Sequence, residues 1–139
     1  MYQWQNFVDP EVDPDTRFFW EGVENGQILL RRCASCDRRS LPPTANCPYC
    51  GATEWTAQPA SGRGRLYSWA VCAVPVDPTF AADIPYTVVM VDLEEGARLY
   101  GRLLNPDAVL NDGMEMQVRF VAAGPDSRTF FGFEAIEDA

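Results

Sequence analysis

The chain has 139 residues, 47% of them hydrophobic, which is enough for one modest core and a small additional unit. All 11 basic residues are arginines, and the absence of histidine and lysine excludes histidine-based hydrolysis, histidine-dependent metal catalysis and lysine Schiff bases. Twenty acidic residues bring the net charge to −9, which opposes stable binding to nucleic acid or an acidic membrane surface.

Residues 1–26 predict an acidic arm followed by one helix. The segment carries six acids against one arginine. Asp13 is suited to cap a helix, Pro14 to its first turn and the Asn25-Gly26 pair to its end, so we expect a helix over 14–25. Three adjacent aromatic residues cover more than one face of this helix. They are candidates for packing on the chain's own core or for docking onto a partner subunit: Phe18, Phe19 and Trp20.

Residues 27–57 contain the most specific motif, two C-x-x-C pairs with ten residues between them. Two such turns can place four thiolates around one metal ion, and a closed shell of four cysteines is typical of structural zinc. Iron is the alternative metal, because the second pair also resembles the iron-binding turn of rubredoxins. Two disulfides are disfavoured, because the chain opens without a signal peptide and we therefore expect a reducing, cytoplasmic location. The predicted ligands are Cys33, Cys36, Cys47 and Cys50.

An independent enzyme is a disfavoured class. The fifth cysteine, Cys72, has no histidine to generate its thiolate, so we interpret it as a small buried side chain of a strand. A closed shell of four thiolates leaves no open coordination position for a substrate. We therefore predict no catalytic residue in this chain.

Arginines gather around the cysteine motif. Between residues 27 and 65 six arginines oppose two acids, a local charge of +4. A solvated ribbon surface is the simplest interpretation. Because a guanidinium group can form two parallel hydrogen bonds with a phosphate, a phosphate-binding patch is the sharper one. Its candidate residues are Arg31, Arg32, Arg38, Arg39, Arg63 and Arg65.

Residues 58–139 predict a small β-barrel. A linker rich in turn residues is followed by five runs with strand character: 65–74, 86–93, 98–104, 115–122 and 129–136. Five strands with a longer link after the third suit the Greek-key OB barrel, whose closure removes exposed sheet edges. The chain is thus predicted to be mainly β, with an arm and helix over 1–26, a zinc ribbon over 27–57 and an OB fold over 58–139.

Several pieces of the chain, in this order, resemble a known family: Phe19-Trp20, the first cysteine pair, Leu41-Pro42-Pro43, the second cysteine pair, the SGRGRLYS run at 61–68, Pro85-Tyr86, the EGARL run at 95–99 and Gly113-Met114. This is the family of zinc-ribbon and OB-fold accessory proteins once catalogued as a domain of unknown function. The resemblance implies a helical segment, a rubredoxin-like zinc ribbon and an OB barrel. Asp37 departs from the glycine of many members, and its carboxylate adds negative charge near the thiolates unless it points away or pairs with Arg38 or Arg39.

The resemblance also implies a non-catalytic subunit for acyl-CoA chemistry. Members assemble with thiolase-superfamily enzymes, including lipid-transfer-type thiolases that act as aldolases on steroid acyl-CoA thioesters. Others serve acetyl-CoA acetyltransferases or enoyl-CoA hydratases. The chain would then bind acyl-CoA through the arginine patch and join two large and two small subunits. The alternative is a nucleic-acid-binding module that would stack bases on Tyr67, Trp69 and Phe131.

Overall fold

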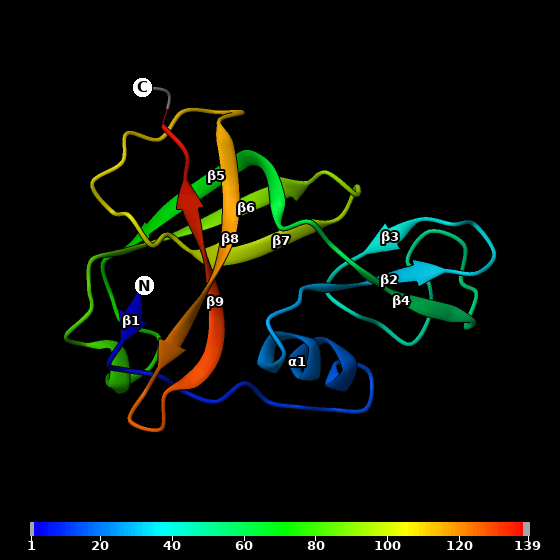
Figure 1. The fold of residues 1–139 in the computed structure, drawn as a ribbon, viewed down its shortest axis with the longest axis horizontal. Coiled ribbons are helices and arrows are strands. Elements are labelled where there is room, and N and C mark those ends of the chain that lie inside the picture. Colours follow the sequence, from blue (N-terminus) through cyan, green and yellow to red (C-terminus); the bar gives the residue numbers. More distant parts are fainter. Residues whose placement is uncertain (1, 138–139) are drawn as a thin grey trace.

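The computed structural model describes residues 2–137, in which a β-barrel and a three-stranded ribbon flank one short helix (Figure 1). Met1, the first residue of the predicted arm, and residues 138–139, the last of the predicted OB fold, lie outside this range. Within the described residues, no helix has the length and apolar character needed to cross a membrane.

The barrel confirms the predicted OB fold and its five strands. One sheet has the order β1-β8-β5-β6-β7, and β9 pairs with β8. A bridge between Leu103 and Phe133 and the Leu104 N–H donated to the Phe133 carbonyl join the end of β7 to β9. Phe133 lies in the barrel core. The strands are β1 (Gln3–Trp4), β5 (Arg63–Cys72), β6 (Tyr86–Leu93), β7 (Arg98–Arg102), β8 (Glu115–Ala123) and β9 (Arg128–Ala135).

The ribbon is a separate antiparallel sheet with β2 at its centre. Its strands are β2 (Leu29–Cys33), β3 (Arg39–Ser40) and β4 (Trp55–Pro59), and the cysteine turns connect them. Ile28 and Leu30 belong to the same buried cluster as the barrel strands. The ribbon therefore shares a core with the barrel at its base and depends on its turns at its tip.

The helix α1 (Arg17–Glu24) begins three residues later than predicted. The Asp13 side chain accepts hydrogen bonds from the N–H groups of Asp15 and Thr16, both at 2.9 Å, so Asp13 stabilises a turn that precedes the helix. The helix ends as expected, since Gly26 has a φ of 74° that continues no right-handed helix.

The three aromatic residues of α1 contact the ribbon and strand β9 of the barrel. Phe19 is 4% exposed and packs against Phe131 of the barrel core, so the expectation that it is exposed for a partner is wrong. Phe18 contacts Trp55 of the ribbon with ring centroids 4.5 Å apart, and Trp20 stacks on Phe130 at 5.8 Å. The helix lies between ribbon and barrel (Figure 1). These two parts of the same chain therefore contact all three aromatic side chains.

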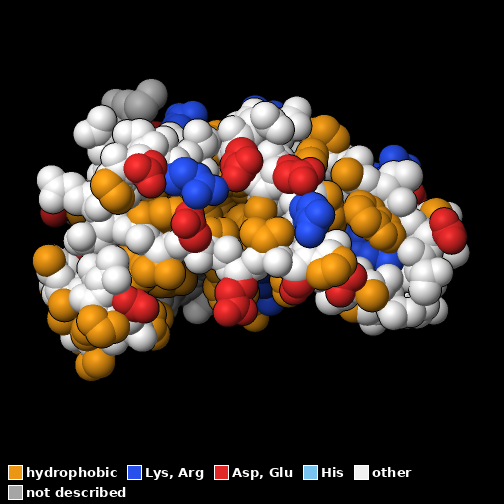
Figure 2. All heavy atoms as spheres, turned by 90° about the horizontal axis from the view of Figure 1, so that it is seen from below, with side chains coloured by type: hydrophobic (Ala, Val, Ile, Leu, Met, Phe, Trp, Pro, Cys, Tyr) orange, Lys and Arg blue, Asp and Glu red, His pale blue; other side chains and the backbone are white. Residues whose placement is uncertain are grey.

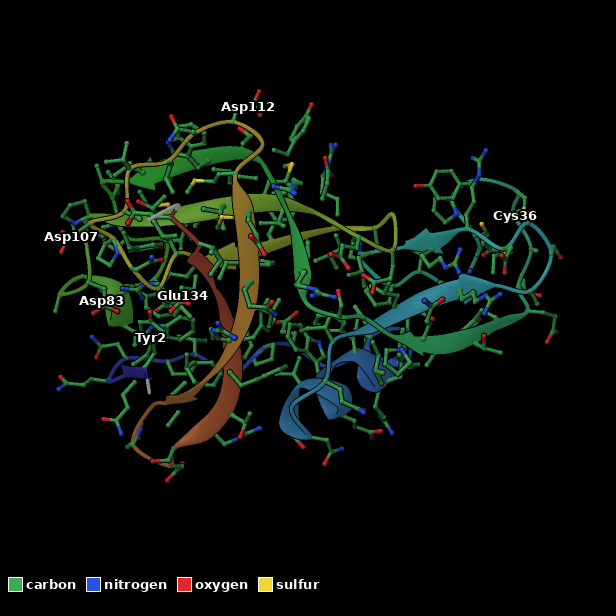
Figure 3. The ribbon with its side chains drawn as sticks, turned by 45° about the horizontal axis from the view of Figure 1, so that its top comes forward. Tyr2, Cys36, Asp83, Asp107, Asp112 and Glu134 are labelled. Atoms are coloured by element: carbon green, nitrogen blue, oxygen red, sulfur yellow. The ribbon has the colours of Figure 1, made fainter. Side chains whose placement is uncertain are left out.

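The N-terminal arm packs on the barrel, which the sequence did not indicate. The Tyr2 hydroxyl donates a hydrogen bond of 2.5 Å to Glu134, and Figure 3 shows Tyr2 on the same side of the barrel as β9. Trp4 and Phe7 both contact the ring of Phe130, at 6.1 and 5.2 Å. The arm therefore covers the open side of the β8–β9 hairpin.

Candidate functional site

The four paired cysteines meet at the tip of the ribbon. Their Sγ atoms all lie within 4.8 Å of one another, with Cys33 to Cys50 and Cys36 to Cys47 each at 3.6 Å. Metal–sulfur bonds of about 2.3 Å place the sulfurs of a regular tetrahedron about 3.8 Å apart, whereas a disulfide needs about 2.05 Å. The four thiols are therefore positioned to bind one metal ion, and the disulfide alternative does not match the structure.

Main-chain N–H groups prepare these sulfurs for a positive ion. Ser35 and Cys36 donate to Cys33 Sγ at 3.4 and 3.5 Å, and Tyr49 donates to Cys47 Sγ at 3.4 Å. The hydrogen bond from the Cys36 N–H is the main reason why the pKa of the Cys33 thiol falls to about 6. These contacts favour the thiolates of Cys33 and Cys47, the form that binds metal, whereas the pKa of Cys36 is raised to about 11.

Asp37 lies immediately beside the cluster with its charge compensated. Its carboxylate accepts from Arg32 at 2.6 Å and lies 3.7 Å from Arg39, whereas the expected alternative partner Arg38 is not among its ion pairs. The hydrogen bond from Arg32 is the main cause of the lowered pKa of Asp37. Its φ of 65° is the left-handed conformation that glycine adopts most readily, so glycine would fit this position without strain.

Arg31 does not belong to a phosphate-binding surface, which corrects the prediction. It is 1% exposed, and its guanidinium donates to the carbonyl oxygens of Thr44, Ala45 and Ala52 at 2.8, 3.2 and 3.3 Å. The loops between the cysteine turns have few main-chain partners of their own, so a buried donor with several N–H groups satisfies them. Arg31 is a structural residue of the ribbon.

The other candidate arginines do not form one patch. Arg32 and Arg39 share Asp37, and Arg63 pairs with Glu94 at 3.5 Å. Arg38 lies over the ring of Tyr49, 4.8 Å from its centroid. Arg65 has no ion pair within residues 2–137 and lines a cavity of the barrel together with three acids, Asp112, Glu115 and Glu137. Of the candidate arginines, Arg38 and Arg39 line one cavity together.

That cavity, of about 500 Å³, lies between the ribbon and the β6–β7 turn. The ribbon forms one side with Cys36, Asp37, Arg38, Arg39 and Tyr49, and Glu95 and Gly96 of the turn form the other. A guanidinium beside an aromatic ring provides both a phosphate donor and a stacking surface. We refer to it as the polar cavity.

Two apolar cavities continue along β7. The first, of about 230 Å³, lies between β7, α1 and the Leu41-Pro42-Pro43 turn, and the second, of about 320 Å³, lies between β7 and the N-terminal arm. They share Trp20, Tyr100 and Phe131. Figure 2 shows hydrophobic side chains in a band across the face where α1 and the arm lie. We call this pair the apolar groove; the proline turn and the helix aromatics were its sequence signals, although their convergence on β7 was not predictable.

The base-stacking surface of the nucleic-acid alternative is not assembled. Phe131 is 4% exposed and packed in the core, so the prediction that it stacks a base is wrong. Tyr67 and Trp69 are exposed on β5, at 52% and 41%. Cys72 at the end of β5 is half-buried, less enclosed than predicted.

A four-cysteine ribbon followed by an OB barrel, with one short helix packed between them, defines a class of two-domain zinc-ribbon and OB-fold proteins. The family model described as "ChsH2, rubredoxin-like zinc ribbon domain" matches residues 20–56, and "ChsH2, C-terminal OB-fold domain" matches residues 57–121. The chain therefore belongs to the ChsH2-type zinc-ribbon and OB-fold family, which confirms the resemblance.

Curated relatives carry names from CoA-thioester chemistry or scaffolding. A probable enoyl-CoA hydratase alpha subunit of Thermomonospora curvata is 34% identical over 84% of this chain, and the chain spans only 36% of that protein. A DUF35 domain-containing scaffold protein of Methanocaldococcus jannaschii is 30% identical, with 83% of this chain and 85% of that protein covered. The benzoylsuccinyl-CoA thiolase subunit BbsA of Thauera aromatica is 30% identical over 68% of each chain.

A solved structure named "Ltp2-ChsH2(DUF35) aldolase" is similar over nearly the whole chain. The TM-score is 0.78 at 32% identity, with 91% of this chain and 98% of the matched chain covered. This chain is thus similar to the complete matched chain, from a structure whose name joins two components.

Proposed function

We propose that this chain is a non-catalytic subunit that binds acyl-CoA and stabilises a thiolase-superfamily partner in a cytoplasmic complex. The observation that carries the proposal is the match of nearly the whole chain to the Ltp2-ChsH2(DUF35) aldolase. The thiolase subunit BbsA, a relative of similar length, supports the same class of partner. A chain with no histidine, no lysine and a closed sulfur cluster supports a binding role over a catalytic one.

The metal in this proposal is one structural zinc ion held by Cys33, Cys36, Cys47 and Cys50. The spacing of the sulfurs fits a closed tetrahedron, and zinc prefers such thiolate sites. A zinc ion bound there would cross-link the two cysteine turns. A metal assay on purified protein tests the choice: one colourless zinc per chain supports it, and a red protein containing iron contradicts it.

The proposed acyl-CoA site follows β7. Coenzyme A combines an anionic nucleotide end with an apolar acyl end, and the cavities lie in a matching order, from the polar cavity at the β6–β7 turn to the apolar groove farther along β7. Arg38 is the strongest phosphate candidate because it stacks on Tyr49 and has no ion pair within the described residues. Arg39, which lines the same cavity, would contribute after partial neutralisation by Asp37, whereas Arg32 is not part of the lining.

Calorimetric titration with octanoyl-CoA tests this site. Arg38→Glu should weaken binding about tenfold or more, because a charge-assisted phosphate contact contributes about 1.5–3 kcal/mol and the new carboxylate repels phosphate. Arg65→Glu is the matched control, since Arg65 lies on the barrel cavity away from β7. Equal affinities for Arg38→Glu and the unchanged chain would contradict the assignment.

Co-expression tests the assembly. The tagged chain is produced with each thiolase-superfamily protein encoded in its own genome, and the mass of any complex is measured by light scattering. We expect one of these proteins to form a complex of two large and two small subunits. A chain that elutes alone in every case would rule the proposed partner class out.

A further inference from the structure

Strand β5 has a free edge over most of its length. It pairs with β6 from Gly64 to Cys72 but with β8 only from Arg63 to Arg65. Leu66 is the last residue with a second neighbour, since its N–H donates to Met114 and its carbonyl accepts from Gly113. Beyond Leu66, no strand in the described part of the chain borders the second edge. In Figure 1 this half of β5 points toward the end of the molecule away from the ribbon.

The register of β6 identifies which main-chain groups lie on that edge. Leu93 and Thr87 of β6 form hydrogen bonds on the β7 side, the first to Ala97 and the second with Leu103. Because alternate residues of an antiparallel strand bond to opposite sides, the even-numbered residues of β6 bond to β5. Their partners on β5 are Ser68, Ala70 and Cys72. The N–H and C=O groups of Trp69 and Val71 therefore point to the free edge.

The side chains along this edge are apolar and exposed. Trp69 is 41% and Val71 62% exposed, and Val74 and Val76 just beyond the strand are 77% and 89% exposed. From residue 68 to 74 the chain carries neither a charge nor a proline. Natural proteins protect free strand edges with lysine, proline or a covering segment, so an unprotected apolar edge indicates a surface that is covered in the functional assembly.

We propose that an extended strand of the partner subunit adds to this free edge and continues the sheet of the barrel past β5. This inference rests on the proposed function, and it identifies where the partner binds and through which atoms. Two hydrogen-bonding residues, Trp69 and Val71, supply the main-chain contacts, and apolar side chains at alternate positions of the incoming strand pack against theirs.

The acidic residues near the free edge favour a different protein, rather than a second copy of this chain, as the source of the added strand. Asp112, Glu115 and Glu137 line the cavity beside Arg65 at one end of the free edge, and Asp77 follows its other end. Figure 3 shows Asp112 on the loop that borders β5. Two copies joined edge to edge would bring these acids together in chains that each carry −9. A partner strand with lysine or arginine near its ends complements them.

Substitution of Val71 in the co-expressed complex tests the inference. Val71→Pro removes the N–H at the free edge but no hydrogen bond to β6. We therefore expect it to weaken the complex at least tenfold and to leave the melting temperature of the free chain unchanged. Val71→Ala is the matched control, because it shortens the side chain and keeps the N–H; we expect less than a fivefold effect. Wild-type affinity for Val71→Pro would overturn the proposal.

Amide hydrogen exchange on the unchanged chain provides a second readout. The Trp69 and Val71 amides should exchange rapidly in the free chain and at least a hundredfold more slowly in the complex. A stable complex in which both stay unprotected would overturn the strand pairing and leave the proposed function standing. If no thiolase-superfamily partner binds the unchanged chain, the proposed function and this inference both fail.

Discussion

Arg31 brings a charged group into the interior of the ribbon, where three main-chain carbonyls surround its guanidinium. Arg31→Leu should lower the free energy of unfolding by about 2–4 kcal/mol, because the buried carbonyls lose their donors. Guanidinium denaturation measures the loss. Arg32→Leu, on the next residue of β2, removes an exposed ion pair and should change stability by less than about 1 kcal/mol. Similar losses for both variants would contradict the structural role of Arg31.

Arg31 and Arg32 are adjacent in the sequence but lie in opposite environments, one buried and one exposed. A charge count treats Arg31 and Arg32 alike, yet alternation along β2 places Arg31 on the face of the predicted metal ligand Cys33 and Arg32 on the opposite one. That alternation was the available signal. The gathering of the four cysteines was predictable, because they lie in two local turns whose spacing is fixed by the chain.

At the scale of the element, α1 contributes to the common core mainly through Phe19. Phe19→Ala should lower the free energy of unfolding by about 3–5 kcal/mol, because it leaves a cavity beside Phe131. Phe18→Ala should cost clearly less, since Phe18 is only half-buried against Trp55. Urea denaturation compares the two. A larger effect at Phe18 would show that the helix depends more on the ribbon than on the barrel.

The tip of the ribbon contains the cysteine cluster rather than an apolar core, so we expect it to depend on bound metal more than on apolar packing. At its tip the residues that are buried include Cys33, Cys47 and Arg31, while the apolar residues Ile28 and Leu30 lie at its base. Cys36→Ser should therefore abolish metal binding and expose the amides of residues 34–54, which include β3, to exchange, while the barrel stays protected. Metal analysis and hydrogen exchange check this. Loss of protection throughout the barrel would indicate that the two parts unfold together.

For the whole molecule, the two folded parts were predictable and their junction was not. Ribbon and barrel follow from local patterns, namely paired cysteines and alternating strands with turn residues. The junction requires contacts between distant segments, such as Trp20 on Phe130 and Arg128 with both Asp9 and Glu24. The arm was interpreted only as acidic, because its charges dominate a composition that also contains Tyr2, Trp4 and Phe7. Its packing on the barrel depends on those aromatic residues.

The arm offers a test that separates the two ends of the proposed acyl-CoA site. Residues 4, 6, 7 and 8 form one wall of the apolar groove, whereas the polar cavity has no arm residue in its lining. Deletion of residues 1–8 should therefore reduce the affinity for octanoyl-CoA about tenfold and leave that for free coenzyme A unchanged, since the arm lines the apolar groove and not the polar cavity. Calorimetry on both ligands measures this. Tyr2→Phe, which removes only the hydrogen bond to Glu134, is the control for arm packing. An equal loss for both ligands would mean that the acyl chain does not lie in the groove.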